Sequence, residues 1–271
     1  MRETAGKNVA AAQRLSEWAV SNGHALRVVD LDVTSDASVQ TAVEQVLTSA
    51  GGLDAVVNNA GASAMGPLEA FTIPQMAALL DLNVLGPMRV NKAVLPTMRA
   101  RRAGLIVWVT STLGRVLPGR GGLYPATKWA AEGFAESLHH QVAPFGIDVV
   151  ILEPGSFPTP ATFKSMNAQE ASVVAAYAEF ALPPRGTHPT DVAHRAPDPQ
   201  DVADAVLELV ELPAGERPLR RVVGPVFTEG VAEYNQTYER VRAHLEEVLR
   251  RPDQAITWTR RSLEEKQNSP G

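Results

Sequence analysis

The chain contains the run Leu105-Ile-Val-Trp-Val-Thr-Ser111 and, thirteen positions after Ser111, the pentapeptide Tyr124-Pro-Ala-Thr-Lys128. The first run is apolar almost to its end, which is typical of a strand that is buried on both faces. The second lies in a segment, residues 121–142, that has the pattern of a helix. Pro125 is tolerated there because it falls in the first helical turn. A buried strand followed by a helix favours an α/β fold.

Tyr124 and Lys128 are spaced for proton transfer. Residues four positions apart lie on the same face of a helix, so the lysine ammonium comes close to the phenol. A phenol normally titrates near pH ~10, and a neighbouring cation lowers that pKa by stabilising the phenolate. The alternative is a half-buried aromatic residue beside a solvated lysine, and the rest of the sequence decides between the two.

Composition excludes several classes of protein. The chain has 271 residues, 45% of them hydrophobic, and a net charge of −5. This acidic balance argues against nucleic acid or an anionic membrane surface as a partner. With no cysteine and with six histidines that lack ligand spacing, we predict no metal site. No segment is apolar enough for a membrane span or a signal peptide, so we expect a cytoplasmic protein.

Helical and strand patterns alternate along the chain, as in a parallel sheet that helices cover. The predicted strands are Ala25–Val33, Leu53–Val57, Leu105–Val109, Gly146–Leu152 and Arg220–Val223. The predicted helices are residues 8–21, 38–49, 74–101, 121–142 and 201–212, with an amphipathic tail after residue 230. Thr34, Ser35 and Asp36 are capping-type residues for the second of these helices.

Polar residues and glycines follow several predicted strands, where a parallel sheet binds its ligands. They are Asp32, the run Asn58-Asn-Ala-Gly61, Ser111 and the turn Pro154-Gly155. Together with Tyr124 and Lys128, these motifs make residues 1–225 resemble the short-chain dehydrogenase/reductase family. The resemblance implies a Rossmann-type, doubly wound parallel sheet in a single domain, and hydride transfer between a nicotinamide cofactor and a carbonyl or alcohol carbon.

The resemblance also implies a role for each motif. In the catalytic set, Tyr124 is the general acid/base and Ser111 donates a hydrogen bond to the substrate oxygen. Lys128 lowers the tyrosine pKa, and Asn83 helps to hold a relay water. The residues that contact the cofactor are Arg2, Asp32, Asn58, Asn59, Ala60, Gly61, Pro154, Gly155 and Thr159, together with Tyr124 and Lys128. Within that set, Lys128 holds the nicotinamide ribose and Thr159 reaches the carboxamide.

The family's glycine-rich phosphate loop has no counterpart in this sequence. Gly6 is the only glycine before Gly23, and Met1-Arg-Glu-Thr resembles the end of the family's second strand. We therefore expect an N-terminally truncated Rossmann sheet that lacks central strands. Either the start codon is placed too far downstream, which we favour, or the truncation is real. In the second case the chain is a catalytically inactive remnant that acts as a binding or dimerising protein.

Cofactor and substrate preferences follow from fewer residues. By family resemblance, Arg2 after the second strand favours NADP(H) over NAD(H). Aromatic and sulfur-containing side chains suggest an apolar wall or lid, and hence a lipophilic ketone or secondary alcohol: Phe157, Phe163, Met166, Tyr177 and Phe180. Residues 156–200 are predicted to form the substrate loop or lid, and residues 226–271 a C-terminal helical tail. The resemblance also implies a homodimer or homotetramer.

Overall fold

Four parallel strands form the main sheet among the residues that the structure describes. The computed structural model describes residues 9–117, 122–157, 159, 165–178, 197–225 and 228–249. The strands are hydrogen-bonded in the order β1-β3-β4-β6. They are β1 (Ala55–Asn58), β3 (Gly104–Val109), β4 (Ile147–Pro154) and β6 (Arg220–Val223). The sequence predicts all four, with ends that differ by no more than two residues.

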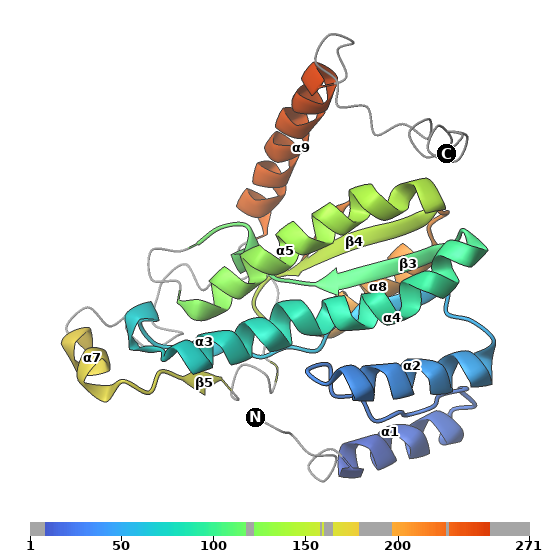
Figure 1. Cartoon of the computed structure of the whole chain (residues 1–271), viewed down its shortest axis with the longest axis horizontal. Helices are drawn as coiled ribbons and strands as arrows, with labels where there is room; N and C mark the ends of the chain where they lie inside the picture. Colours follow the sequence, from blue (N-terminus) through green and yellow to red (C-terminus); the bar gives the residue numbers. More distant parts are fainter. Residues whose placement is uncertain are drawn as a thin grey trace, which may run out of the picture. The chain divides into compact units, whose positions relative to one another are not determined.

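Helices cover both faces of this sheet, which explains why its strands are apolar on both sides. Ile106 and Trp108 of β3 point into a core that α2, α4 and α5 complete. Leu105 and Val107 point the opposite way, into a core with α8. Figure 1 shows α4 and α5 on the near side of β3 and β4, with α8 behind them. The fold is an α/β domain of the Rossmann type, as predicted.

Except for Ala171–Ala176, which lies in the predicted substrate loop, the described helices of this domain lie within or close to the predicted helical segments. They are α1 (Val9–Ser21), α2 (Asp36–Ala50), α3 (Ile73–Leu80), α4 (Gly86–Arg101), α5 (Leu123–Val142), α7 (Ala171–Ala176) and α8 (Gln200–Glu211). Ser35 is the N-cap of α2, and its hydroxyl oxygen accepts a hydrogen bond from the Ser38 backbone N–H at 3.3 Å. This confirms one of the three capping-type residues as the start of the helix.

The prediction of a strand over Ala25–Val33 is wrong. The segment pairs with no strand in the described part of the chain, and Leu26, Val28 and Leu31 are 44%, 47% and 48% exposed. Alternating apolar residues make a segment able to join a sheet, but a strand also needs a neighbour for its N–H and C=O groups. Within the described residues, β1 pairs with β3 alone.

The predicted helix over residues 74–101 is interrupted. Between α3 and α4, residues Asp81–Leu85 form a π-helical turn. Such turns insert one residue into a helix and are frequent at functional sites. Asn83, the residue singled out from the sequence, lies in this turn with 2% of its surface exposed.

A second, two-stranded parallel sheet joins the segment after β1 to the predicted substrate loop. It pairs β2 (Ala64–Met65) with β5 (Met166–Asn167). The side chain of Gln75 on α3 donates to the Asn167 carbonyl at 2.8 Å, and the Tyr177 hydroxyl donates to Glu69 at 2.8 Å. Part of the predicted loop or lid, including Phe163 and Phe180, lies outside the described residues.

The chain divides into two compact units, residues 1–228 and 229–271. The described part of the second unit is helix α9 (Glu229–Leu249). Arg242 on α9 forms ion pairs with Glu239 and Glu246, at the three- and four-residue spacings that bring side chains together on a helix. Among the described residues, no helix combines the length and apolar character that a membrane crossing needs.

Candidate active site

Lys128 is buried at the carboxyl end of the sheet. It lies in the second turn of α5, is 8% exposed, and its Nζ donates to the Val109 carbonyl at the end of β3 at 2.9 Å. Burial lowers the pKa of Lys128 to about 8, although the negative charge of Glu132 opposes that shift. The structure thus holds a lysine whose proton is easier to remove than that of an ordinary exposed lysine.

Tyr124 lies one turn before Lys128, near the start of α5. The Nζ atom of Lys128 is 5.7 Å from the centre of the Tyr124 ring. The ring is half-buried against an apolar cluster that contains Phe71, Leu79 and Leu123. Tyrosine and lysine therefore occupy one face of the helix, as their spacing predicts.

Ser111 follows β3 and begins a 3₁₀ turn, Thr112–Gly114. Its Oγ accepts a hydrogen bond from the Leu113 backbone N–H at 3.2 Å, and the residue is 7% exposed. Helix α5 lies against this turn. The hydroxyl hydrogen of Ser111 is not used in that bond, because the oxygen acts there as an acceptor.

Asn83 connects the loop after β1 to α5. Its Oδ1 accepts from the Ala62 backbone N–H at 2.9 Å, and its Nδ2 lies 3.0 Å from the Ala62 carbonyl and 2.9 Å from Thr127 Oγ1. A β-carbon at Gly61 would lie 3.0 Å from Asn83 Oδ1 and 3.8 Å from Lys128 Nζ. Gly61, Asn83 and Lys128 are thus brought together, and glycine leaves room for the close approach.

The other residues of the Asn-Asn-Ala-Gly run differ in exposure. Asn58 is buried, and its Nδ2 donates to Asn91 Oδ1 at 2.9 Å. Asn59 and Ala60 are exposed at the carboxyl end of β1. Asn58 is thus the residue of the run whose side chain is fixed by a buried contact. The sequence did not predict this contact, because Asn91 lies 33 positions away.

The turn after β4 is held beside β6. Pro154 pairs with Val223 across the sheet, and the Gly155 N–H donates to the Val223 carbonyl at 2.8 Å. Gly224 has φ +108°, and a β-carbon there would lie 2.7 Å from the Phe157 ring. The Thr159 N–H donates to the Phe157 carbonyl at 3.0 Å. Glycine at 224 is required both by its backbone conformation and by this close approach.

Asp32 is exposed, and it forms hydrogen bonds with residues that follow it closely in sequence. Its Oδ1 accepts from the backbone N–H of Thr34 at 2.9 Å and from the Thr34 hydroxyl at 2.7 Å. Its own N–H donates to Ser38 Oγ at 2.9 Å. These bonds form the turn that leads into α2. The predicted contact of Asp32 with adenine is untested, and Arg2 lies outside the described residues.

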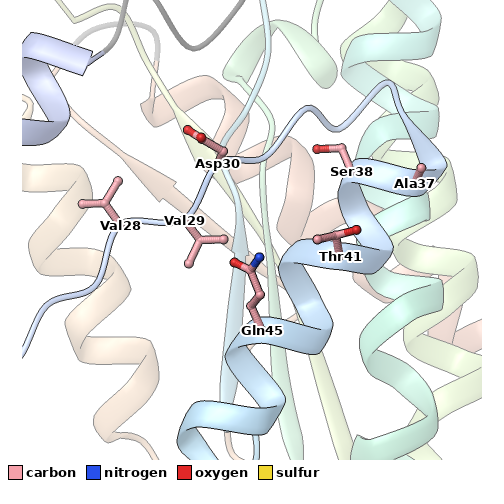
Figure 2. Close-up of a pocket in the computed structure, with 7 residues that line it drawn as sticks. All are labelled: Val28, Val29, Asp30, Ala37, Ser38, Thr41 and Gln45. Carbon is pink, nitrogen blue, oxygen red and sulfur yellow. The ribbon is translucent and has the colours of Figure 1, made fainter.

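A surface pocket of about 520 Å³ lies between the segment before Asp32 and α2. Figure 2 shows Ser38, Thr41 and Gln45 pointing from α2 toward that segment. The lining residues are Val28, Val29, Asp30, Ala37, Ser38, Thr41 and Gln45. None of the predicted catalytic residues lines it, so this pocket is separate from the site around Tyr124.

The sequence did not predict a buried group of charged residues next to Tyr124 and Lys128. Glu132 on α5 and Glu153 on β4 are 2% and 0% exposed, and Arg115 is 6% exposed. Arg220 of β6 lies 3.5 Å from Glu132 and 3.4 Å from Glu153. Spacing signalled Glu132 alone among these residues, because Tyr124, Lys128 and Glu132 follow one another at four-residue intervals along α5.

The geometry fits part of a bound nucleotide. A buried lysine, a glycine that permits close approach and the ends of three parallel strands converge there, which is where open α/β sheets bind nucleotides. Lys128, Gly61 and the turn Pro154-Gly155 are the groups available to hold it.

Comparison with known proteins agrees with this arrangement. A family model described as short chain dehydrogenase matches residues 3–170. Retinol dehydrogenase 8 of Bos taurus is 34% identical over 225 residues, which are 78% of this chain and 68% of that protein.

Solved structures give the same assignment. A short-chain dehydrogenase from Streptomyces avermitilis is 30% identical, with a TM-score of 0.65 over 87% of this chain and 83% of its own. An alcohol dehydrogenase from Thermococcus sibiricus, complexed with 5-hydroxy-NADP, is 26% identical, with a TM-score of 0.60 over 79% of this chain and 80% of its own. The chain belongs to the short-chain dehydrogenase/reductase family of NAD(P)-dependent oxidoreductases.

Proposed function

We propose that this protein interconverts a ketone or aldehyde and an alcohol, with Tyr124 as the general acid/base. The observation that carries the proposal is the Tyr124–Lys128 pair, whose lysine is buried 5.7 Å from the tyrosine ring. An ammonium at that place lowers the pKa of the phenol, because it stabilises the phenolate. Tyr124 then gives a proton to the carbonyl oxygen in reduction and takes one from the alcohol in oxidation.

Ser111 and Asn83 have supporting roles in this proposal. The Ser111 hydroxyl donates a hydrogen bond to the substrate oxygen and so fixes it near Tyr124. Asn83 holds the Gly61–Ala62 loop against α5 through the bonds between its amide and Ala62. In the family scheme this asparagine also helps to hold a water that passes protons, which is compatible with its position beside Thr127.

The bound nicotinamide cofactor supplies or accepts the hydride. We propose that its adenine contacts Asp32. The residues proposed to contact the rest of the cofactor are Asn58, Asn59, Ala60, Gly61, Tyr124, Lys128, Pro154, Gly155 and Thr159. We favour NADP(H) over NAD(H). Arg2 in the sequence supports this preference, and so does the 5-hydroxy-NADP bound to the Thermococcus sibiricus alcohol dehydrogenase.

The substrate we propose is lipophilic. Met166 and the Tyr124 ring belong to the same apolar cluster, so the surroundings of the phenol are apolar. The name of the Bos taurus relative, retinol dehydrogenase, points to a lipophilic alcohol for that protein. We also propose a homodimer or homotetramer on the basis of the family resemblance.

Replacement of Tyr124 by Phe tests the catalytic role. We expect kcat for NADPH oxidation with medium-chain 2-alkanones to fall by about 10²–10⁴-fold, because a general acid contributes a factor of that size. The NADPH dissociation constant, measured by fluorescence titration, should stay nearly unchanged. Tyr234→Phe on α9 is the matched control, since it removes the same hydroxyl from a half-exposed tyrosine of the second unit.

Two results would count against the proposal. Full turnover in Tyr124→Phe would remove Tyr124 from its role while leaving the family assignment intact. Failure of the unaltered chain to bind NADPH at all would instead favour the alternative function, a binding or dimerising protein without catalysis.

A further inference from the structure

Five ionisable residues follow one another along a single face of α5. They are Tyr124, Lys128, Glu132, Glu136 and His140, spaced at four-residue intervals. The proposed proton transfer uses only the first two. Glu132 continues the row into the protein interior, where 2% of its surface is exposed. A buried carboxyl group one turn from a buried lysine calls for a physical explanation, since burial of a charge is costly.

Charged groups from three other elements face Glu132. Arg115, at the end of the 3₁₀ turn that Ser111 begins, lies 3.5 Å from its carboxyl group. Arg220 of β6 also lies 3.5 Å away, and Glu153 of β4 lies within 3.9 Å of both arginines. Arg220 in addition binds Glu136 at 2.6 Å. Glu132 is therefore the shared member of a cluster that joins α5 to the ends of β3, β4 and β6.

The Thr110 hydroxyl and the burial of Glu132 act on its pKa in opposite directions. Thr110 Oγ1 lies 3.2 Å from Glu132 Oε1 and 3.1 Å from the Leu152 carbonyl. A hydroxyl has one proton to donate, and both of these oxygens are acceptors when Glu132 is ionised. The Leu152 carbonyl already accepts from the Thr110 backbone N–H at 2.8 Å, so the hydroxyl proton is available to Glu132, and this bond by itself lowers the pKa of Glu132. Burial, with the charge of Glu153, raises the pKa of Glu132 to about 8.

Val109, the last residue of β3, and Thr110, which follows it, contact two consecutive turns of α5. The Val109 carbonyl accepts from Lys128 Nζ at 2.9 Å, and the Thr110 hydroxyl lies 3.2 Å from the Glu132 carboxyl group. The turn after Ser111 also rests on Glu132, since a β-carbon at Gly114 would lie 2.5 Å from its Oε1. Glu132 thus contacts both segments that carry the proposed catalytic groups.

We propose that Glu132 is a positioning residue for the Tyr124–Lys128 pair: its carboxyl group fixes α5 against the Ser111 turn and sets the charge beside Lys128. This inference rests on the proposed role of Tyr124 and Lys128. Glu132 acts through Lys128 and Thr110, not on the substrate. As an anion it accepts from the Thr110 hydroxyl and stabilises the Lys128 ammonium.

The test is a ¹³C NMR titration of the whole chain labelled at lysine Cε. The chain has five lysines, and Lys128→Arg assigns the signal. In Glu132→Gln, which keeps the shape but cannot ionise, we expect the pKa of Lys128 to fall by about half a unit or more. Thr110→Val should shift it in the same direction by less, because loss of the hydroxyl keeps Glu132 neutral to higher pH.

Glu136→Gln is the matched control, because it removes a carboxylate from the same row one turn farther from Lys128. We expect the Lys128 titration of that variant to match the unaltered chain. If Glu132 were merely structural, Glu132→Gln and Thr110→Val would lower the stability of the chain but leave the pKa of Lys128 unchanged. That result would overturn the proposal. The readout needs no turnover, so it is separable from failure of the Tyr124→Phe test.

Discussion

At the scale of single residues, Asn83 shows how one amide can organise a site. Its oxygen accepts from the Ala62 N–H, and its nitrogen lies within 3.0 Å of both the Ala62 carbonyl and the Thr127 hydroxyl. Asparagine supplies one acceptor and two donors, which matches these partners. The π-helical turn places the side chain between the loop and α5. An isosteric group that lacks the donors cannot serve both sides.

The substitution Asn83→Asp therefore has a predictable cost. Aspartate keeps the bond from the Ala62 N–H but sets a carboxylate oxygen against the Ala62 carbonyl, in a buried position. We expect the free energy of unfolding to fall by about 1–3 kcal/mol, measured by urea denaturation. The exposed Asn22→Asp loses a bond to the Trp18 carbonyl in contact with water, and should lower the free energy of unfolding by less than about 1 kcal/mol. Equal effects at the two positions would show that the Asn83 contacts carry no stability.

The residues of the proposed site differ in how far the sequence could predict them. Tyr124, Lys128 and Asn83 lie in short motifs, and the structure sets them on adjoining elements as predicted. Glu132, Arg115 and Arg220 were missed, although all three are buried. Charged residues are mostly exposed, so a single sequence gives no reason to place two arginines and a glutamate together. Only tertiary packing brings them into contact.

At the scale of elements, apolar patterns predicted whether a segment is a strand or a helix better than they predicted whether a helix is unbroken. The strands β3 and β4 were recognised because both of their faces are apolar over most of their length, and β1 and β6 because each has a short apolar run. The helix over residues 74–101 was predicted as one element, yet Asp81–Leu85 forms a π-helical turn. Gly86 and Pro87 follow that turn directly, and proline lacks the N–H that would bond to the Asn83 carbonyl, so the sequence did contain a signal for the interruption. The turn is stabilised by contacts with a loop 21 positions away in sequence, between Asn83 and Ala62.

Two glycines on neighbouring elements test how closely α5 packs. A β-carbon at Gly114 would lie 2.5 Å from Glu132 Oε1 and 3.2 Å from the Lys128 carbonyl, whereas nothing lies within 4 Å of one at Gly133. We expect Gly114→Ala to lower the free energy of unfolding by about 1–3 kcal/mol. Gly133→Ala, in the exposed interior of the helix, should raise it by about 0.5–1 kcal/mol.

Thermal and urea denaturation measure both changes. The pair separates two physical causes, because the same methyl group is added each time. If Gly114→Ala were as stable as the unaltered chain, the turn that Ser111 begins would not be packed on Glu132, and the positioning role of Glu132 would lose its geometric basis.

At the scale of the whole molecule, the wrong strand is informative. Residues 25–33 have the composition of a strand, but pairing depends on a neighbour that composition does not describe. Val33 is nevertheless buried in the core beside α2 and α4. Arg89 ties this region together, since it bonds the Val33 carbonyl and pairs with Asp36 and Asp81. The segment is therefore anchored at its end without belonging to a sheet.

The buried cluster also makes global stability depend on pH. The pKa of Glu132 rises from 4.5 to about 8 on folding. Between these values the folded state binds more protons than the unfolded state, so the free energy of unfolding falls as pH rises. The contribution is complete below the unfolded pKa and lost above about 8. Lys128, whose pKa falls from 10.5 to about 8, reverses the trend above that value, because there the unfolded chain binds more protons.

Urea denaturation of the unaltered chain should therefore show a minimum in stability near the pKa values of these two groups. In Glu132→Gln the fall between about pH 5 and about pH 8 should be weaker, by up to about 1.4 kcal/mol per pH unit, since one titrating group is gone. Glu136→Gln should keep the slope of the unaltered chain. Parallel curves for Glu132→Gln and the unaltered chain would mean that Glu132 titrates alike in both states, and that the cluster does not hold its proton.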